Sequence, residues 1–253
     1  MPENKSKNPV AAAGYLLKAV PLATKPGIKR FVIIPLAINI MVFVLALWAG
    51  IHYFSIFMND MLDFSGLWDW VAAILEFIRP LLWVVFFAAY LIIVFYGFSI
   101  LANIIAAPFN SLLAEATEKY LSGQPLNDQG GIMALLKDVP PLIWMEIRKL
   151  IYFLLRAIPL LLLFIIPFTA PIAPIIWFLF SAWMMSLQYM DYPMGNHRIN
   201  FAEQKLKQKQ KRMFSLGYGS VVLGATMLPI INFVIIPLAV IAATQIWVEH
   251  YKE

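Results

Sequence analysis

The sequence predicts an all-α integral membrane protein with two long transmembrane helices and two proline-tipped helical hairpins that penetrate the bilayer part-way. Of its 253 residues, 62% are hydrophobic and 13% are charged, and the mean hydropathy is +0.78. A soluble domain carries about 25% charged residues, so this composition is typical of a membrane protein. Two uncharged runs are long enough to span a bilayer, and two further apolar stretches are broken by prolines. We expect residues 1–253 to form a single membrane domain, with residues 1–9 disordered.

The first apolar run, Val10 to Leu17, is short, is closed by Lys18 and lacks a cleavage site, so it does not predict a cleavable signal. Cysteine is absent, which excludes disulfides, thiolate metal sites and cysteine nucleophiles. The three histidines are far apart, and no hydrolase or nucleotide-binding motif occurs. We therefore expect no enzyme, no catalytic residues, no metal, no cofactor and no nucleic-acid partner.

Two segments predict full transmembrane helices. Residues 31–58 hold one titratable group, His52, over 28 residues, and a helix crosses a bilayer with roughly 20 apolar residues. Residues 80–114 are uncharged over 35 residues, or about 52 Å of helix, so they span once and project beyond the hydrocarbon. A bend is expected near Pro108.

The distribution of Lys and Arg predicts the orientation. Six basic residues precede Phe31, whereas the segment from Asp60 to Arg79 holds four acids and one Arg. The later polar segments are again basic. Because Lys and Arg are retained on the cytoplasmic side, both termini should be cytoplasmic and the Asp60–Arg79 segment external, with an interfacial helix around Trp68 and Trp70.

The remaining apolar stretches, residues 150–190 and 213–248, predict helical hairpins. Prolines remove backbone donors and break helices, and they cluster in the middle of each stretch. The arms of the second hairpin are 16 residues each, about 24 Å, against a hydrocarbon core of about 30 Å. Hairpins that penetrate part-way are favoured, and six full spans are the alternative.

The best candidate for an anion site is the segment from Lys25 to Phe31. Proline favours a helix start, where free N–H groups carry partial positive charge. Gly27 leaves space for an oxyanion, and Lys29 and Arg30 add charge, Arg being able to donate two parallel hydrogen bonds. The alternative is that these cations only mark the cytoplasmic end of the helix.

Other polar residues lie within or beside the apolar runs. Asparagines between membrane helices often act as structural hydrogen-bonding groups, and together they could line a polar route. Arg156 either lines that route or reaches back to the cytoplasmic interface. Acids that flank the spans, such as Glu118 and Asp191, are expected to cap helices or face cytoplasmic water. The candidates for lining a route are Asn39, Asn103, Asn110, Glu115, Arg156 and Asn232.

Two further patterns have simple interpretations. Gly217, Gly219 and Gly224 are expected to permit close helix packing. The basic run from Lys205 to Arg212 is expected to contact anionic lipid headgroups, so membrane lipids are predicted partners.

Several segments in order along the chain resemble the CysZ family of bacterial inner-membrane sulfate permeases. The matching segments are Pro26 to Leu36, Ile105 to Asn110, Leu112 to Glu115, Lys137 to Pro140, Trp177 to Met184, Gln188 to Tyr189, Asp191 to Pro193, Asn196 to His197, and Ile230 to Asn232. The resemblance implies sulfate uptake for cysteine biosynthesis, a multi-pass protein of the cell inner membrane, and a homo-oligomer. It also implies a sulfate site at Gly27, Lys29 and Arg30, with Lys29 standing where the family often has Arg.

We therefore expect a sulfate permease that acts as a passive, channel-like conduit, because the sequence has no nucleotide-binding loop and no acid inside its apolar runs. The alternative is a non-transporting membrane scaffold or partner-binding protein whose hairpins wedge into one leaflet.

Overall fold

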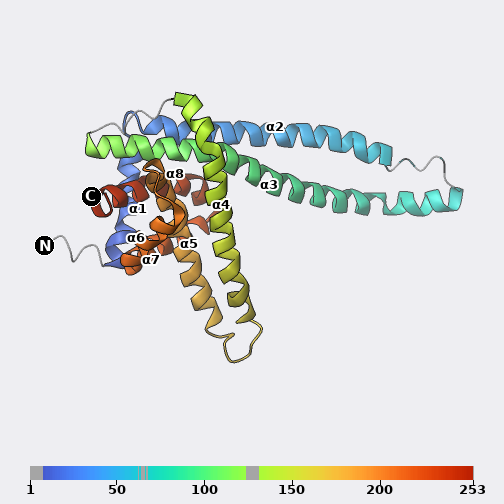
Figure 1. Cartoon of the computed structure of the whole chain (residues 1–253). Helices are drawn as coiled ribbons and strands as arrows, with labels where there is room; N and C mark the ends of the chain where they lie inside the picture. Colours follow the sequence, from blue (N-terminus) through green and yellow to red (C-terminus); the bar gives the residue numbers. More distant parts are fainter. Residues whose placement is uncertain (1–7, 62, 64–65, 67, 124–130, 253) are drawn as a thin grey trace. The chain divides into compact units, whose positions relative to one another are not determined.

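A computed structural model describes residues 8–252 except 62, 64–65, 67 and 124–130, and every regular element in this part is an α-helix (Figure 1). The predicted all-α membrane fold is confirmed. The helices are α1 (Pro9–Ala23), α2 (Lys29–Met61), α3 (Asp69–Ser122), α4 (Gly131–Leu162), α5 (Ala173–Asn196), α6 (Phe201–Gln210), α7 (Arg212–Thr226) and α8 (Pro229–His250). Asn8 and Pro9 are the N-cap and first residue of α1, in place of the disorder expected there.

The chain divides into two compact units, which we describe separately. One is Ile33–Pro108, here called the long-helix unit. The other combines Met1–Val32 with Phe109–Glu253, here called the packed unit. Both α2 and α3 contribute to each unit. In the described part, three helical stretches are long and apolar enough to cross a bilayer: Lys29–Asp60, Asp69–Ile92 and Ala173–Asn196.

The long-helix unit contains most of α2 and α3, which lie against each other through aromatic rings. Phe54 on α2 contacts Trp83 and Tyr90 on α3, each with ring centroids 5.2 Å apart. The apolar side chains of these helices are otherwise largely exposed, as expected of surfaces whose solvent is lipid.

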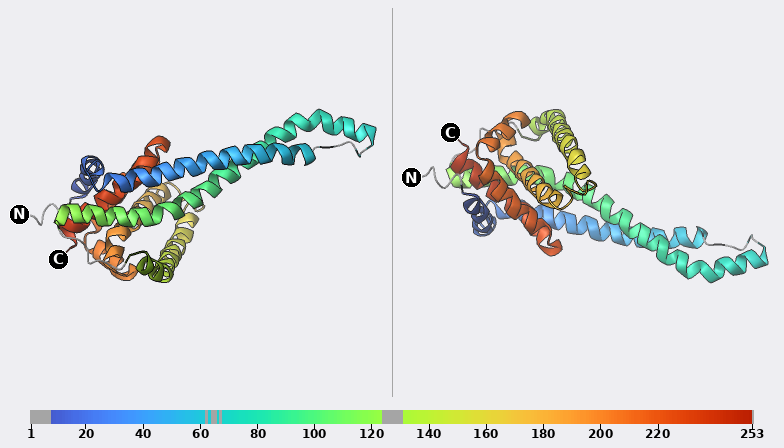
Figure 2. Two further views of the ribbon diagram at one scale, coloured as in Figure 1. Left: turned by 90° about the horizontal axis from the view of Figure 1, so that it is seen from above. Right: turned by 90° about the horizontal axis from the view of Figure 1, so that it is seen from below.

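The start of α3 differs from the prediction. Asp69 to Arg79 are its first turns rather than a separate interfacial helix, so α3 runs for 54 residues. The helix contains Pro80, and Figure 2 shows it changing direction in its cyan first turns. A proline inside a helix removes one backbone hydrogen bond and commonly bends it. The residues from Asp69 to Arg79 therefore belong to the long apolar helix itself.

In the packed unit, α8 is enclosed by α1, α5 and α7. Ala239 through Ala243 on α8 are all fully buried. Tyr218 on α7 donates a hydrogen bond of 2.7 Å to the backbone oxygen of Ala239. The second predicted hairpin is thus α7 and α8, with its turn at Met227 and Leu228, and much of it forms the core of the unit.

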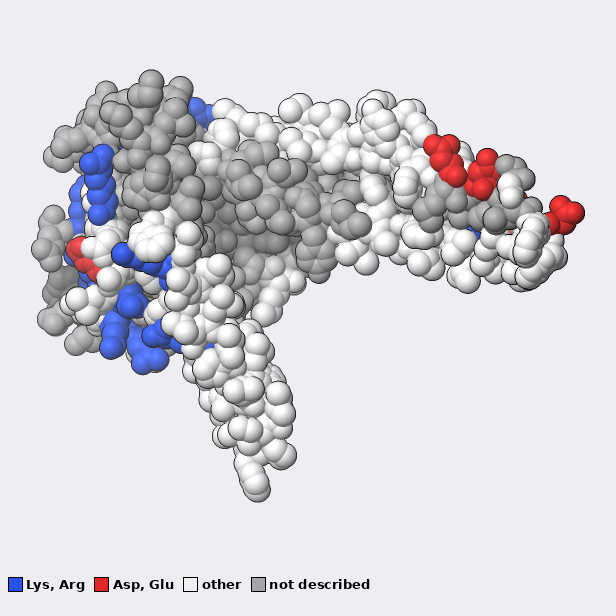
Figure 3. All heavy atoms as spheres, turned by 45° about the vertical axis from the view of Figure 1, so that its right-hand side comes forward, with Lys and Arg blue, Asp and Glu red and all other residues white. Residues whose placement is uncertain are grey.

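The first predicted hairpin is α4 and α5, joined by residues 163–172. Thr169 lies within this connection, and its hydroxyl donates to the oxygens of Leu163 (2.8 Å) and Ile166 (3.2 Å). Consecutive backbone turns bond most of the N–H groups of the connection. Phe168 is 92% exposed, and the outer part of the hairpin shows no charged side chain in Figure 3. Internal bonding of the N–H groups lowers the cost of placing such an apolar tip in hydrocarbon.

Two of the three glycines on α7 allow close helix contacts, as predicted. A Cβ on Gly219 would lie 1.8 Å from the backbone oxygen of Ala182 on α5, and one on Gly217 would lie 2.3 Å from that of Pro9 on α1. A Cβ on Gly224 would meet nothing within 4 Å, so the packing explanation is wrong there.

We expect Gly219→Ala to destabilise the protein by about 1–3 kcal/mol, because α5 and α7 must separate to admit the methyl group. Gly224→Ala is the matched control on the same helix and should be neutral or stabilise by up to about 1 kcal/mol through helix propensity. Thermal unfolding of both variants in detergent measures the difference. Equal midpoints would contradict the close packing of α5 on α7.

Candidate anion-binding site

The turn between α1 and α2 has a conformation that depends on Gly27. Its φ is +90°, a backbone region that side chains disfavour and that glycine adopts readily. The oxygen of Lys25 accepts from the N–H groups of Ile28 (3.1 Å) and Lys29 (3.0 Å). Ile28 is 1% exposed and belongs to the core of the packed unit. The buried Ile28 side chain therefore anchors the turn, whereas Gly27 is exposed.

The outer side of this turn is basic. Lys25, Lys29 and Arg30 are exposed, and within the part of the chain that the structure describes none of them forms an ion pair. The guanidinium of Arg30 lies over the Phe31 ring, 4.7 Å from its centroid, which limits its freedom. Among the described backbone groups, no oxygen accepts from the N–H of Gly27 or Arg30. The turn thus offers free donors and cations together, the chemistry that a tetrahedral oxyanion requires.

The position of α1, which leads into this turn, is fixed by its contact with the end of α8. The hydroxyl of Tyr15 donates to Glu249 Oε2 (2.5 Å) and lies 2.9 Å from His250 Nε2. Burial lowers the pKa of His250 and the nearby charge of Lys211 lowers it further, against an opposing effect of Glu249, so the net shift favours the neutral imidazole.

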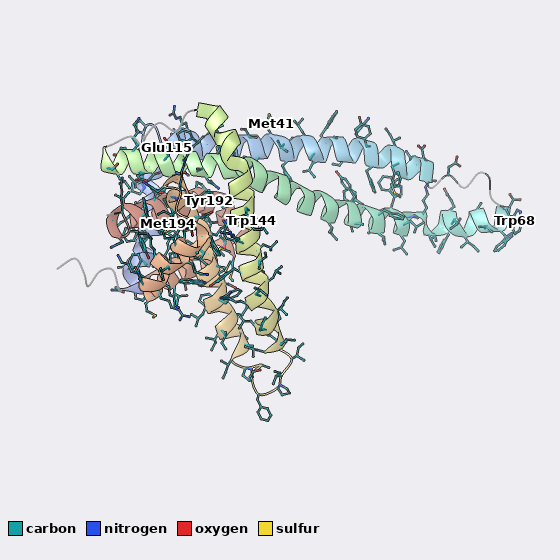
Figure 4. All side chains as sticks on the ribbon, in the orientation of Figure 1. Met41, Trp68, Glu115, Trp144, Tyr192 and Met194 are labelled. Carbon is teal, nitrogen blue, oxygen red and sulfur yellow. The ribbon has the colours of Figure 1, made fainter. Side chains whose placement is uncertain are left out.

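The structure describes the side chains of two of the four asparagines predicted to line a route, Asn39 and Asn110. Asn110 is 6% exposed, and its amide donates to the Tyr192 hydroxyl at 3.2 Å inside the packed unit (Tyr192 is labelled in Figure 4). Asn39 lies on α2 in the long-helix unit, where its Oδ1 is buried without a partner among the described residues. Asn103 and Asn232 lie on α3 and α8, but their side chains are outside the described part.

The two charged candidates are both at the surface. Glu115 is exposed on α3. Arg156 is exposed on α4, where its guanidinium lies 3.7 Å from the centroid of the Tyr152 ring and donates to the Tyr152 backbone oxygen at 3.3 Å.

Sequence reasoning missed that two flanking acids are buried. Glu118 is 0% exposed and accepts from His197 Nε2 (2.9 Å) and from Lys252 Nζ (2.7 Å). The expectation that Glu118 and Asp191 cap helices or face water is therefore wrong. Burying a carboxylate is costly unless it is paired and hydrogen-bonded, and here the partners come from α5 and the C-terminus.

Asp191 on α5 forms the other buried pair. Its Oδ2 lies 2.7 Å from Lys149 Nζ on α4, and its Oδ1 accepts from Gln204 Nε2 on α6 at 2.7 Å. Lys149 is 4% and Asp191 8% exposed. A charge at the base of each hairpin arm was visible in the sequence, but only the fold shows that the two charges meet.

We expect Asp191→Asn to destabilise the protein by about 3–5 kcal/mol, because it removes the carboxylate charge that the buried Lys149 ammonium contacts at 2.7 Å. Glu115→Gln removes a carboxylate from an exposed position and should change stability by less than about 0.5 kcal/mol. Thermal unfolding in detergent compares the two. An Asp191→Asn variant as stable as Glu115→Gln would show that the ion pair is not required.

These features define the class of protein: an all-α membrane protein with long apolar helices, an apolar hairpin and a basic glycine turn. Residues 15–237 match the family described as "EI24: Sulfate transporter CysZ/Etoposide-induced protein 2.4". The chain belongs to this family, and the resemblance stated from the sequence is confirmed.

Three relatives illustrate the similarity. The "Sulfate transporter CysZ" of Vibrio parahaemolyticus is 41% identical over 243 residues, which cover 94% of each chain. The protein of the same name from Pectobacterium atrosepticum is 40% identical over 239 residues, 94% of this chain and 84% of that one. The Vibrio cholerae protein of this name is 40% identical over 247 residues, 94% of this chain and 93% of that one.

Proposed function

We propose that this chain is a sulfate permease of the bacterial inner membrane, importing sulfate for cysteine biosynthesis. The observation that carries the proposal is the Gly27 turn, where N–H groups and the exposed cations Lys25, Lys29 and Arg30, all without a partner of opposite charge among the described residues, flank a glycine with a φ of +90°. The relatives named as sulfate transporters support the choice of sulfate over other oxyanions. It is a transport function, not an enzymatic one, since the proposed chemistry only binds and releases the ion.

Each group in the turn has a distinct role toward sulfate. The N–H groups of Gly27 and Arg30 would donate to one face of the tetrahedral ion, and the Arg30 guanidinium would donate two parallel bonds. Lys29 would contribute a point charge on a side chain that is more mobile than that of an Arg at the same position. A permease must also release its ion, and an exposed site that is open to water favours rapid exchange.

The proposed mechanism is passive. Among the described residues, Glu118 and Asp191 are the buried carboxylates, and both are held in ion pairs, which makes them poor proton carriers. A cell-negative potential opposes uptake of a dianion by about 4.6 kcal/mol per 100 mV. Passive uptake therefore requires that the cell keeps sulfate low by consuming it, as assimilation does.

The topology and assembly form part of the same proposal. Both termini are cytoplasmic, the Asp60–Arg79 segment is external, and the α4–α5 and α7–α8 hairpins penetrate part-way within one membrane domain. Copies of the chain associate as a homo-oligomer in contact with membrane lipids. The six polar candidates for the route, from Asn39 to Asn232, stay candidates, although the amide of Asn110 already bonds Tyr192.

A non-transporting scaffold is the competing function. The exposed apolar tip around Phe168 would suit a protein that wedges into one leaflet. A scaffold function, however, does not explain why cations and N–H groups without partners among the described residues lie together at the Gly27 turn. The permease is therefore the better account.

We expect Lys29→Ala/Arg30→Ala to weaken sulfate binding about tenfold or more, because two charge-assisted contacts are lost. Lys29→Arg should bind as well as the native chain or better. Lys207→Ala/Lys209→Ala is the matched control, since it removes two cations from α6. Binding of radiolabelled sulfate to purified protein measures the effect. Native affinity in the first variant, with native folding, would remove the site from the Gly27 turn.

Sulfate flux into liposomes that contain only the purified protein tests the function. We expect flux to follow the sulfate gradient and the membrane potential without a proton gradient, and to persist in His52→Ala, which removes the one histidine of the predicted spans. Uptake equal to that of empty liposomes would favour the scaffold. Accumulation against the electrochemical gradient when only a proton gradient is applied would overturn the passive mechanism but keep sulfate as the substrate.

A further inference from the structure

Two helices, α2 and α3, connect the packed unit to the long-helix unit, and each has a proline close to the boundary. The boundary falls between Val32 and Ile33 on α2 and between Pro108 and Phe109 on α3. Pro35 lies inside α2 just beyond Val32, and Pro108 lies inside α3 at the boundary itself. Each proline lacks an N–H group, so the backbone oxygen one turn earlier loses its helical hydrogen bond and the helix bends more easily there.

On the packed-unit side of the prolines, both helices are fixed to their neighbours. Phe31 and Val32 on α2 pack against the core. On α3, Ser111 exchanges two hydrogen bonds with Asn196 of α5: Ser111 Oγ donates to Asn196 Oδ1 (2.6 Å), and Asn196 Nδ2 donates to the Ser111 backbone oxygen (3.0 Å). These ends of α2 and α3 therefore belong firmly to the packed unit.

On the other side of the prolines, α2 and α3 are held to each other. A Cβ on Gly50 of α2 would lie 1.5 Å from the hydroxyl oxygen of Tyr90, so this side chain of α3 lies directly against the α2 backbone. The ring of Phe54 on α2 contacts both Trp83 and Tyr90. The two helices therefore form one paired rod, and a bend at one proline requires a bend at the other.

The rod is longer than the hydrocarbon core of a bilayer. From Ile33 to Met58, α2 runs for 26 residues, which is about 39 Å against a core of about 30 Å. A helix that exceeds the local thickness tilts, and the tilt changes with the thickness of the bilayer. Lys29 and Arg30 lie on the packed-unit side of Pro35. A stiff connection would therefore pass every change of tilt on to the Gly27 turn.

We propose that Pro35 and Pro108 form a paired hinge, which lets the rod of α2 and α3 change its tilt with bilayer thickness while the packed unit and its Gly27 turn keep their conformation. The hinge requires no transport, so it stands whether or not the chain carries sulfate. Pro80 is the matched control, because it lies inside α3 but away from the boundary, within the long-helix unit.

Distances between spin labels, measured by double electron–electron resonance in nanodiscs of two thicknesses, test the hinge. The chain has no native cysteine, so Leu17→Cys on α1 and Leu45→Cys on α2 place labels at exposed positions of the two units. The intervening chain keeps these labels within about 50 Å of each other. Between dimyristoyl- and dierucoylphosphatidylcholine we expect their mean distance to shift by about 5 Å, because a lever of about 15 Å beyond Pro35 turns by about 20°.

The proline variants are compared on this label pair. Pro35→Ala/Pro108→Ala restores both helical hydrogen bonds and should reduce the shift to less than about half, whereas Pro80→Ala should retain it. A second pair, Leu45→Cys and Leu81→Cys, lies within the rod and should keep its distance in both lipids.

Three outcomes would overturn the hinge. The native chain could show no shift, the double variant could shift as much as the native chain, or Pro80→Ala could lose the shift, which would place the bending inside the long-helix unit. If the double variant does not fold, as judged by size-exclusion chromatography, Pro35→Ala and Pro108→Ala are measured singly. Each should reduce the shift, since the two bends are coupled, and a native shift in both would contradict the proposal.

Discussion

The buried ion pair between Lys149 and Asp191 is the interaction on which the arrangement of the packed unit depends. It joins α4 to α5 at the base of a hairpin whose outer surface is apolar and exposed. Gln204 ties α6 to the same carboxylate. Because a buried charge is costly without its partner, the pair fixes how the three helices meet. That arrangement in turn brings Lys205 onto the ring of Tyr152.

Because a buried charge needs a partner, burial also distinguishes the charges that have structural roles from those that are available to a ligand. Glu118 and Asp191 are buried and each has two partners. The cations of the Gly27 turn are exposed and unpaired in the described chain, although Ile28 beside them belongs to the core. A rigid base under exposed donors lowers the cost of ordering them around an anion. The buried carboxylates thus stabilise the fold, whereas the exposed cations of the Gly27 turn are available to bind an anion.

Local sequence patterns predict much of the fold. The contacts between residues far apart in the sequence could not be predicted in this way. Uncharged length and proline position predict the long helices and the hairpin tips, since both act locally on the helix. The continuation of α3 back to Asp69 was missed because the charges between Asp60 and Arg79 suggested a separate interfacial segment. The partners of Glu118 come from residues far along the chain, so no local pattern identifies them. Gly27, Lys29 and Arg30 were predicted as an anion site because glycine, helix start and charge coincide within one short segment, and this stays a prediction.

The location of a bound oxyanion tests the central claim most directly. Selenate is a tetrahedral dianion like sulfate, and its selenium gives an anomalous signal in crystals of the protein grown with native methionine. The account predicts an anomalous peak beside the N–H of Gly27, within contact distance of the Lys29 and Arg30 side chains. A peak elsewhere in the chain, with this turn empty at saturating selenate, would contradict it.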